Sequence, residues 1–211
     1  GFNLKAGGQL VLAKEATSSA DPLVWLNDTG QTTNKVIVFA QDGSEKANIG
    51  LAGNDATITV AGSERMRIDT SGRLLIGHTS SIASDGFNSS LQVNGTDGDN
   101  SSIYQSRFSN NNSPPNFVLA KARSGGIGSN GVVQEDDLLG NIQFHGNDGS
   151  GFHNGANIFA IVEAGVGNND MPTSLGFATN AGSTSTGTKM RLSGDGRLTA
   201  GSIDPGSSSG L

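Results

Sequence analysis

Short stretches in which apolar and polar residues alternate recur along most of the chain. A period of two indicates a strand with one buried face, whereas an amphipathic helix needs a period near 3.6, which no stretch sustains. In GNIQFHG, Ile142 and Phe144 point to one side and the polar residues to the other, which predicts a half-buried strand with one wet face. Strands are predicted at residues 35–40, 56–60, 73–77, 116–122, 141–146 and 157–164.

Turn signals separate these stretches. Asp-Gly and Asn-Gly pairs, for example at 42–43, 94–95 and 148–149, tolerate the positive φ of tight hairpin turns. Residues 8–16 could begin a helix, but their first half alternates like a strand. We therefore predict an all-β protein of short antiparallel strands joined by tight turns.

One hairpin-like sequence, here called the cassette, occurs twice. ERMRIDTSGRLLIG at 64–77 returns as TKMRLSGDGRLTAG at 188–201. The spacing between the copies is far longer than the roughly 20–50 residues of a solenoid repeat. It predicts two β-rich modules, 1–81 and 82–211, that each end in a cassette.

The repeated positions of the cassette suggest a structural element. They are Arg67, Gly72 and Arg73 in the first copy and Arg191, Gly196 and Arg197 in the second. The glycines are expected at turn positions with left-handed backbone geometry. The arginines could bind an anionic polysaccharide, or they could pair with Asp69 or Asp195 of a neighbouring chain. The rigid repeated frame and the negative net charge favour the pairing.

Composition allows only a thin core. Leu, Ile, Val and Phe make up about 23 % of 211 residues, just above the level typical of disordered chains. Either the chain is loosely folded, or several chains share one core. The net charge of −6 argues against nucleic acid as a partner, and the absence of Cys excludes disulfides and thiol chemistry.

The cassette also carries a family resemblance. ERMRIDTSGRLLIGHTSS resembles a cassette common in bacteriophage tail fibres and related virion adhesins, and residues 91–201 resemble the module that precedes it there. The resemblance implies intertwined homotrimeric fibre modules in the virion tail, extracellular when they act. It implies other virion tail proteins and a host surface glycan or outer-membrane receptor as partners. Many relatives continue into an endosialidase-type intramolecular chaperone, and the final residues here lack its charged helical segment.

Two clusters could carry chemistry. Glu135, Asp136 and Asp137 could act as paired carboxylates in glycoside hydrolysis, although adjacent acids on one loop favour a solvated turn. His145 and His153 could bind a metal on a three-fold axis, but their spacing fits no established motif. We expect neither catalysis nor a bound metal or cofactor.

Several loops have simpler interpretations. Residues 146–151 and 167–172 resemble calcium loops in composition but lack the EF-hand pattern. Residues 125–131 lack the Gly-Lys-Ser/Thr sequence and the following helix of a phosphate loop. Trp25 and Tyr104 could stack on sugars, but core packing is equally compatible with each.

An Asn-rich loop is the candidate for receptor contact. SNNNSPPN at 109–116 combines exposed polar residues with two prolines, and recognition sits disproportionately on such loops. Its candidate residues are Asn110, Asn111, Asn112 and Asn116.

The sequence therefore predicts a virion structural protein that is not an enzyme. It would be a trimeric tail-fibre segment for host attachment or receptor display. Two alternatives stay open: a polysaccharide-degrading tailspike, and a capsid or tail decoration protein that binds only other virion proteins.

Overall fold

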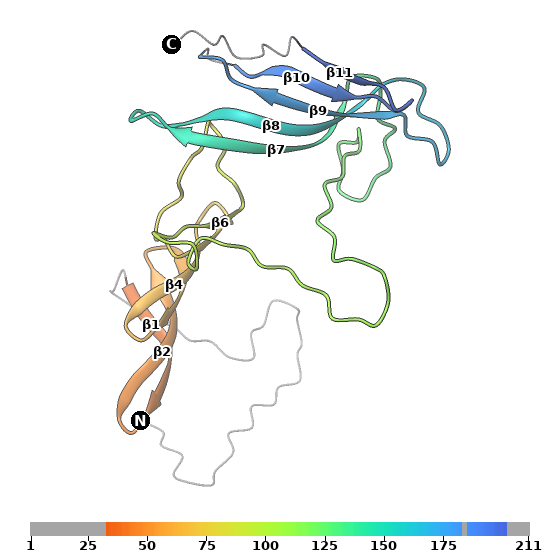
Figure 1. Cartoon of the computed structure of the whole chain (residues 1–211). Coiled ribbons are helices and arrows are strands. Elements are labelled where there is room, and N and C mark those ends of the chain that lie inside the picture. Colours follow the sequence, from red (N-terminus) through yellow and green to blue (C-terminus); the bar gives the residue numbers. More distant parts are fainter. Residues whose placement is uncertain (1–32, 183–184, 202–211) are drawn as a thin grey trace. The chain divides into compact units, whose positions relative to one another are not determined.

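The computed structural model describes residues 33–182 and 185–201, which form strands and loops (Figure 1). The prediction of an all-β protein is confirmed for these residues. None of their segments is a helix long and apolar enough to cross a membrane. Residues 8–16 and Trp25 lie outside the described part of the chain.

Eleven strands are present in the described residues. They are β1 Thr33–Gln41, β2 Ser44–Ala52, β3 Asp55–Val60, β4 Ser63–Ile68, β5 Leu74–Ile76, β6 Leu91–Val93, β7 Leu138–Asn147, β8 Phe152–Val162, β9 Thr173–Thr179, β10 Gly187–Leu192 and β11 Leu198–Ala200.

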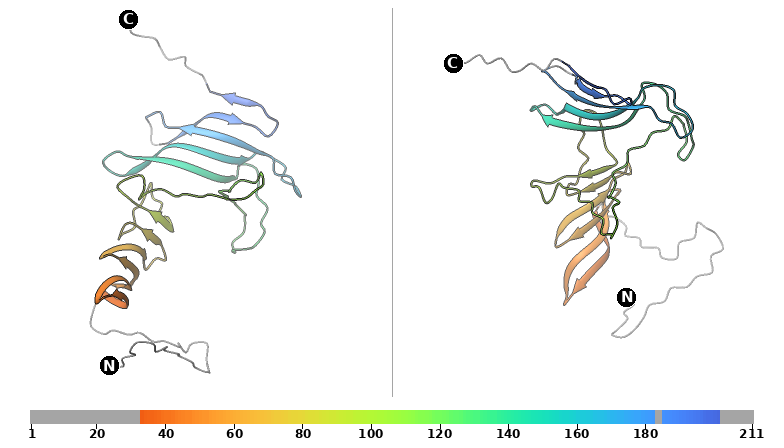
Figure 2. Two further views of the ribbon diagram at one scale, coloured as in Figure 1. Left: turned by 60° about the horizontal axis from the view of Figure 1, so that its bottom comes forward. Right: turned by 45° about the vertical axis from the view of Figure 1, so that its right-hand side comes forward.

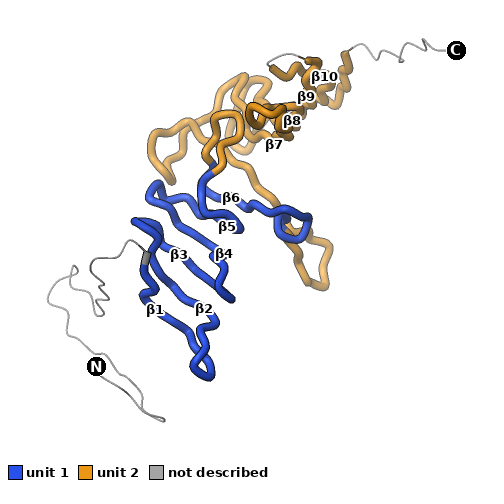
Figure 3. Tube along the Cα trace, turned by 90° about the vertical axis from the view of Figure 1, so that its left-hand side faces the viewer, with its two compact units in different colours: residues 1–81, 89–103 blue, residues 82–88, 104–211 orange. Residues whose placement is uncertain are grey.

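The described residues divide into two compact units (Figure 3). One unit contains residues 33–81 and 89–103, and the other contains 82–88 together with 104–182 and 185–201. Each unit has one sheet of its own. The module boundary at 81/82 that the cassette suggests stays a prediction.

The sheet of the first unit contains six strands in chain order, β1 to β6. The first five strands form an antiparallel meander, because tight turns connect neighbours that lie next to one another. Strand β6 pairs with β5 in parallel, which the prediction of antiparallel strands missed. A parallel neighbour requires a longer connection, and residues 77–90 supply it.

The sheet of the second unit contains five antiparallel strands in the order β11-β10-β9-β8-β7. Figure 2 shows the strands of each sheet from two further sides. Strands β7 and β8 are the longest, and the turn at 148–151 joins them as a hairpin. The second cassette forms β10 and β11, as the first forms β4 and β5.

The strand predicted at 116–122 is wrong. These residues form no strand, and Phe117 and Val118 are 78 % and 75 % exposed. β-branched and aromatic residues favour a strand only where a neighbour supplies ladder hydrogen bonds and packing, and no strand of the described residues pairs with this segment. The prediction also missed β2 and β9, whose glycines and small residues weaken the sequence signal.

Candidate functional site

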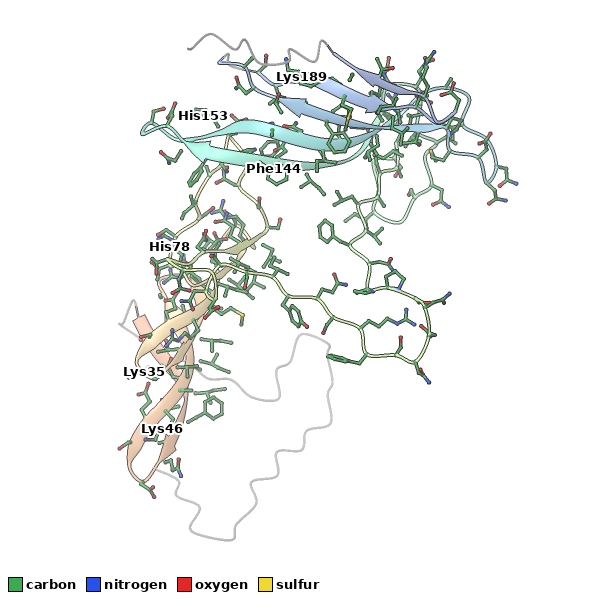
Figure 4. All side chains as sticks on the ribbon, in the orientation of Figure 1. Lys35, Lys46, His78, Phe144, His153 and Lys189 are labelled. Carbon is green, nitrogen blue, oxygen red and sulfur yellow. The ribbon has the colours of Figure 1, made fainter. Side chains whose placement is uncertain are left out.

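The first sheet presents one face made almost entirely of apolar side chains. Cross-strand pairing places on this face a row that crosses all six strands: Ile37, Ile49, Ile58, Met66, Ile76 and Val93. Phe39 on the same face is 53 % exposed, and Ile68 is 48 % exposed. The side chains are drawn on the ribbon in Figure 4.

The opposite face of this sheet is polar and better covered. Asn48, Thr57 and Gln92 alternate with the apolar row and are each at most 7 % exposed. Leu75 is fully buried on this face. The first sheet thus departs from the usual arrangement of a soluble sheet, because its apolar face is open while several polar side chains of the other face are buried.

The second sheet also has an open apolar face. One row of apolar residues crosses it from β7 to β11: Ile142, Ile158, Phe177, Met190 and Ala200. Phe144 and Leu198 on this face are 54 % and 61 % exposed. A pocket of about 310 Å³ lies on the face, where Phe117 and Leu119 meet the strands.

The alternation predicted for 141–146 correctly indicates which residues share a face, but it is wrong about which face is buried. Ile142 and Phe144 do share one side, opposite Asn141 and Gln143. Ile142 is nevertheless 45 % exposed, so the apolar side is also open within a single chain. Alternation indicates which residues share a face, but not what covers that face.

The arginines of the first cassette are held by carboxylates. Arg67 donates from Nε and Nη2 to the two oxygens of Glu64 at 2.7 and 2.8 Å, and from Nη1 to Asp55 at 2.6 Å. Its side chain is only 13 % exposed. These hydrogen bonds, above all those to Glu64, raise the pKa of Arg67.

The turn of the first cassette is organised by Asp69. Its carboxylate accepts hydrogen bonds from the backbone N–H groups of Ser71 and Arg73 and from Nε of Arg73. The Arg73 backbone N–H makes the largest contribution to lowering the pKa of Asp69, and the Arg73 side chain adds to it. Gly72 has a φ of +76°, in the left-handed region that the turn requires.

These contacts correct the pairing favoured from the sequence. Asp69 forms an ion pair with Arg73 of its own chain. Glu64 and Asp55 form ion pairs with Arg67, also within the chain. The pairing is local because the turn and the adjacent strand place both charges within a few ångströms. A neighbouring chain is not needed to satisfy these two arginines.

The second cassette keeps the turn but has fewer carboxylates. Gly196 has a φ of +85°. Arg191 donates from Nε to Oγ of Ser174 at 2.6 Å and lies 3.7 Å from Glu163. Arg197 has no side-chain hydrogen bond or ion pair with the described residues. The two arginines line an open pocket of about 620 Å³.

The Asn-rich loop is exposed and ordered around one side chain. Oδ1 of Asn111 accepts a hydrogen bond from the backbone N–H of Ser113 at 3.1 Å and lies 3.1 Å from Oγ of Ser109. The backbone carbonyl of Asn116 accepts from the Gln105 amide at 2.9 Å. Asn110 and Asn112 are exposed on the loop. The role of this loop in receptor contact stays a prediction.

Of the three residues in the acidic cluster, Asp137 is buried and held by partners, whereas Glu135 and Asp136 are exposed. Asp137 has a side chain only 7 % exposed and accepts hydrogen bonds from Lys121, Arg123 and the Gln134 backbone. These bonds, above all that to Arg123, lower the pKa of Asp137. Asp137 therefore anchors the loop before β7, and its low pKa is unsuited to a general acid at neutral pH.

The histidines also have local partners. Nδ1 of His145 lies 2.7 Å from Oγ of Ser84. Nε2 of His153 lies 3.5 Å from Asp148, whose pKa is lowered to about 2, chiefly by hydrogen bonds from Ser150. Across residues 33–182 and 185–201, no three His, Asp or Glu residues gather into a possible metal site.

The loops that resemble calcium loops are tight turns. Asp148 accepts the backbone N–H groups of Ser150 and Gly151, which closes the hairpin between β7 and β8. Residues 167–170 form a turn closed by backbone hydrogen bonds between Gly167 and Asp170. The described structure supports the turn interpretation for both segments.

Sequence reasoning missed two groups of charged residues. Lys121 and Arg123 form ion pairs with Asp137. Lys121 lies in the segment wrongly predicted as a strand, and Arg123 follows it directly. Lys189 lines the pocket beside the second cassette, and Glu163 lines it from the end of β8. The signal that could have identified Lys189 is its alignment with Arg65 in the repeat, because both copies keep a basic residue at this position.

Comparison with known proteins adds information on the fold alone. No family model matches the chain, and no curated protein matches it. Among solved structures, the carboxy-terminal domain of the bacteriophage T5 L-shaped tail fibre aligns over 97 % of this chain and 90 % of that one, with a TM-score of 0.57 and 15 % identity.

A second solved structure contains the same T5 domain with its intramolecular chaperone domain. It aligns over 97 % of this chain at a TM-score of 0.58 and 15 % identity, and the chain spans 62 % of its length. At this level of identity the comparison establishes a shared fold. The chain is thus similar in fold to the carboxy-terminal domain of a phage tail fibre.

Proposed function

We propose that this chain is a segment of a phage tail fibre that assembles as a homotrimer and serves host attachment. The fold similarity to the T5 tail-fibre domain supports a place in a virion tail. The observation that carries the proposal is the open apolar face on each sheet. Other virion tail proteins and a host surface glycan or outer-membrane receptor are the proposed partners.

The apolar faces favour assembly for an energetic reason. An exposed apolar surface of this extent is uncommon on a soluble monomer, and each Å² removed from water contributes roughly 25 cal/mol. Ile37, Phe39, Ile49 and Ile68 are each 40 % exposed or more on one continuous face. Three copies of the chain can bury these faces against one another and form the core that one chain lacks.

The proposed action is adhesion without a chemical step. Each chain in a trimer presents the same loops, so several weak contacts act together and gain avidity through effective concentration. We expect the chain to have no catalytic role. Asp137 of the acidic cluster is engaged by Lys121 and Arg123 and is unsuited to act as one of a catalytic carboxylate pair. Incubation with host glycans is expected to release no reducing ends.

Light scattering coupled to size exclusion tests the assembly. The native protein should have a mass near three times the 21.4 kDa of one chain. Phe39→Asp places a charge on the open apolar face and should reduce the mass to that of a monomer. A single-chain mass for the wild type would contradict the proposal.

Val38→Asp is the matched control. Val38 is the neighbour of Phe39 in β1 and is 47 % exposed, but it faces the opposite side of the sheet. This variant should therefore keep the mass of the assembly. Equal effects of the two variants would show that general damage to β1, and not loss of a covered face, explains the result.

A further inference from the structure

The two cassettes pair with the preceding strand in the same register, but their first arginines contact different side chains. Arg67 lies opposite Thr57 of β3, two residues after Asp55, and the two charges bond. Arg191 lies in the same register against β9, where the residue equivalent to Asp55 is Ser174. A hydroxyl therefore replaces a carboxylate at the closest contact of this arginine.

The other two carboxylates of the first cassette are replaced in the same way. Glu64, three residues before Arg67, corresponds to Thr188. Asp69, which holds the side chain of Arg73, corresponds to Ser193, whose hydroxyl bonds to Asp195 and to the Arg197 carbonyl. All three acidic partners of the first copy are thus neutral hydroxyl residues in the second.

This loss of carboxylates leaves a cationic pocket. Lys189, Arg191 and Arg197 line the open pocket of about 620 Å³ beside β10 and β11, with Glu163 as its one carboxylate. Lys189 is marked in Figure 4. Like Arg197, it has no side-chain hydrogen bond or ion pair within residues 33–182 and 185–201.

Glu163 does not neutralise the pocket. One of its oxygens accepts the backbone N–H of Gly194 at 3.0 Å, and the other lies 3.7 Å from Arg191. Asp195, in the adjoining turn, does not line the pocket. Hydrogen bonds from the Ser193 hydroxyl and then from the Arg197 backbone lower the pKa of Asp195, and the charge of Arg197 adds to this effect. The side chain of Arg191 remains 42 % exposed and able to donate further hydrogen bonds.

We infer that the second cassette carries a binding site for the carboxylate or phosphate groups of an acidic glycan. The guanidinium fork matches planar oxyanions bidentately, and a lysine nearby adds a mobile positive charge. The hydroxyls of Thr188, Ser193 and Thr199 give the same pocket neutral hydrogen-bonding groups suited to sugar hydroxyls. The role of this pocket as a receptor site rests on the proposed attachment function. The binding measurement below tests the pocket independently of that function.

Calorimetry with defined oligosaccharides tests the site on the full chain. The probes are hexagalacturonate, which carries carboxylates, maltohexaose as a neutral hexasaccharide, and inorganic phosphate as a free anion. Hexagalacturonate should bind, and its affinity should fall as NaCl rises from about 50 to about 500 mM, because salt screens the charges. Maltohexaose should bind at least about tenfold more weakly, since charge-assisted hydrogen bonds are absent.

The double variant Lys189→Gln with Arg197→Gln should reduce hexagalacturonate affinity at least about tenfold. Neither side chain makes a hydrogen bond or ion pair within the described residues, so the thermal midpoint of the double variant should match that of the wild type. Lys46→Gln removes one exposed positive charge from the other unit and should change affinity less than about twofold.

Three outcomes would overturn the inference. They are no hexagalacturonate binding by the wild type, unchanged affinity in the double variant, and phosphate that binds as tightly as the glycan. A change in assembled mass in the double variant would show that these charges serve a contact between chains instead. The native mass is read separately, so a failed glycan test leaves the proposed assembly intact.

Discussion

The first and second cassettes share a backbone and differ in how their charges are satisfied. In both, a strand, a turn with a left-handed glycine and a second strand follow one another. In the first, carboxylates surround Arg67 and Arg73, whereas Arg191 meets a hydroxyl and Arg197 meets no side-chain partner in the described residues. The turn geometry thus requires glycine in both copies. The arginines are not constrained in this way, so they can stabilise the fold in one copy and bind a ligand in the other.

The largest expected difference concerns the first arginine of each copy. Arg67→Gln leaves Glu64 and Asp55 without their cation in a site where Arg67 was 13 % exposed, so we expect a loss of about 3 kcal/mol. Arg191→Gln removes a hydrogen bond from a more exposed side chain and should cost less than about 1 kcal/mol. Urea denaturation of the assembled protein measures both, and equal losses would abolish the distinction.

The turn glycines should behave alike. Gly72→Ala and Gly196→Ala each force an L side chain into positive φ, which should cost about 1–2 kcal/mol. No atom lies within 4 Å of the added Cβ at either position, so backbone strain is the sole cause. Gly98→Ala, with similar open space and no positive φ, is the control and should leave the thermal midpoint nearly unchanged.

The smallest expected effect is a difference in pH dependence. The pKa of Asp69 is lowered in the fold, so this carboxylate stabilises the first cassette above its unfolded pKa of about 3.9. That contribution is lost as the pH falls below this value towards the folded pKa. Asp69→Asn should therefore reduce the drop in thermal midpoint between pH 7 and pH 3. An undiminished drop would assign the acid sensitivity to other groups.

Much of the fold could be predicted from local pattern. Alternation identified strands around Val38, Ile58, Leu75, Ile142 and Ile158, because a period of two is a local property of the chain. Turn glycines were equally predictable, since positive φ excludes most other residues.

The misses have a common physical cause. The segment around Phe117 has strand-forming residues but no partner strand among residues 33–182 and 185–201. Strand β9 forms despite a weak pattern because β8 and β10 supply partners on both sides. Pairing is a long-range property. The partners of the candidate charges were hidden for the same reason, as Ser174 approaches Arg191 only through the pairing of β9 with β10.

The sequence by itself determined that the chain is all-β, that one hairpin element occurs twice, and that its glycines occupy the turns. These features depend on residues close in the chain. Only the tertiary structure decided which face of each sheet is open, and that Arg67 is neutralised while Arg191 and Arg197 line a cationic pocket. Burial and ion pairing depend on strands far apart in the sequence, and alternation or a repeated arginine does not specify them.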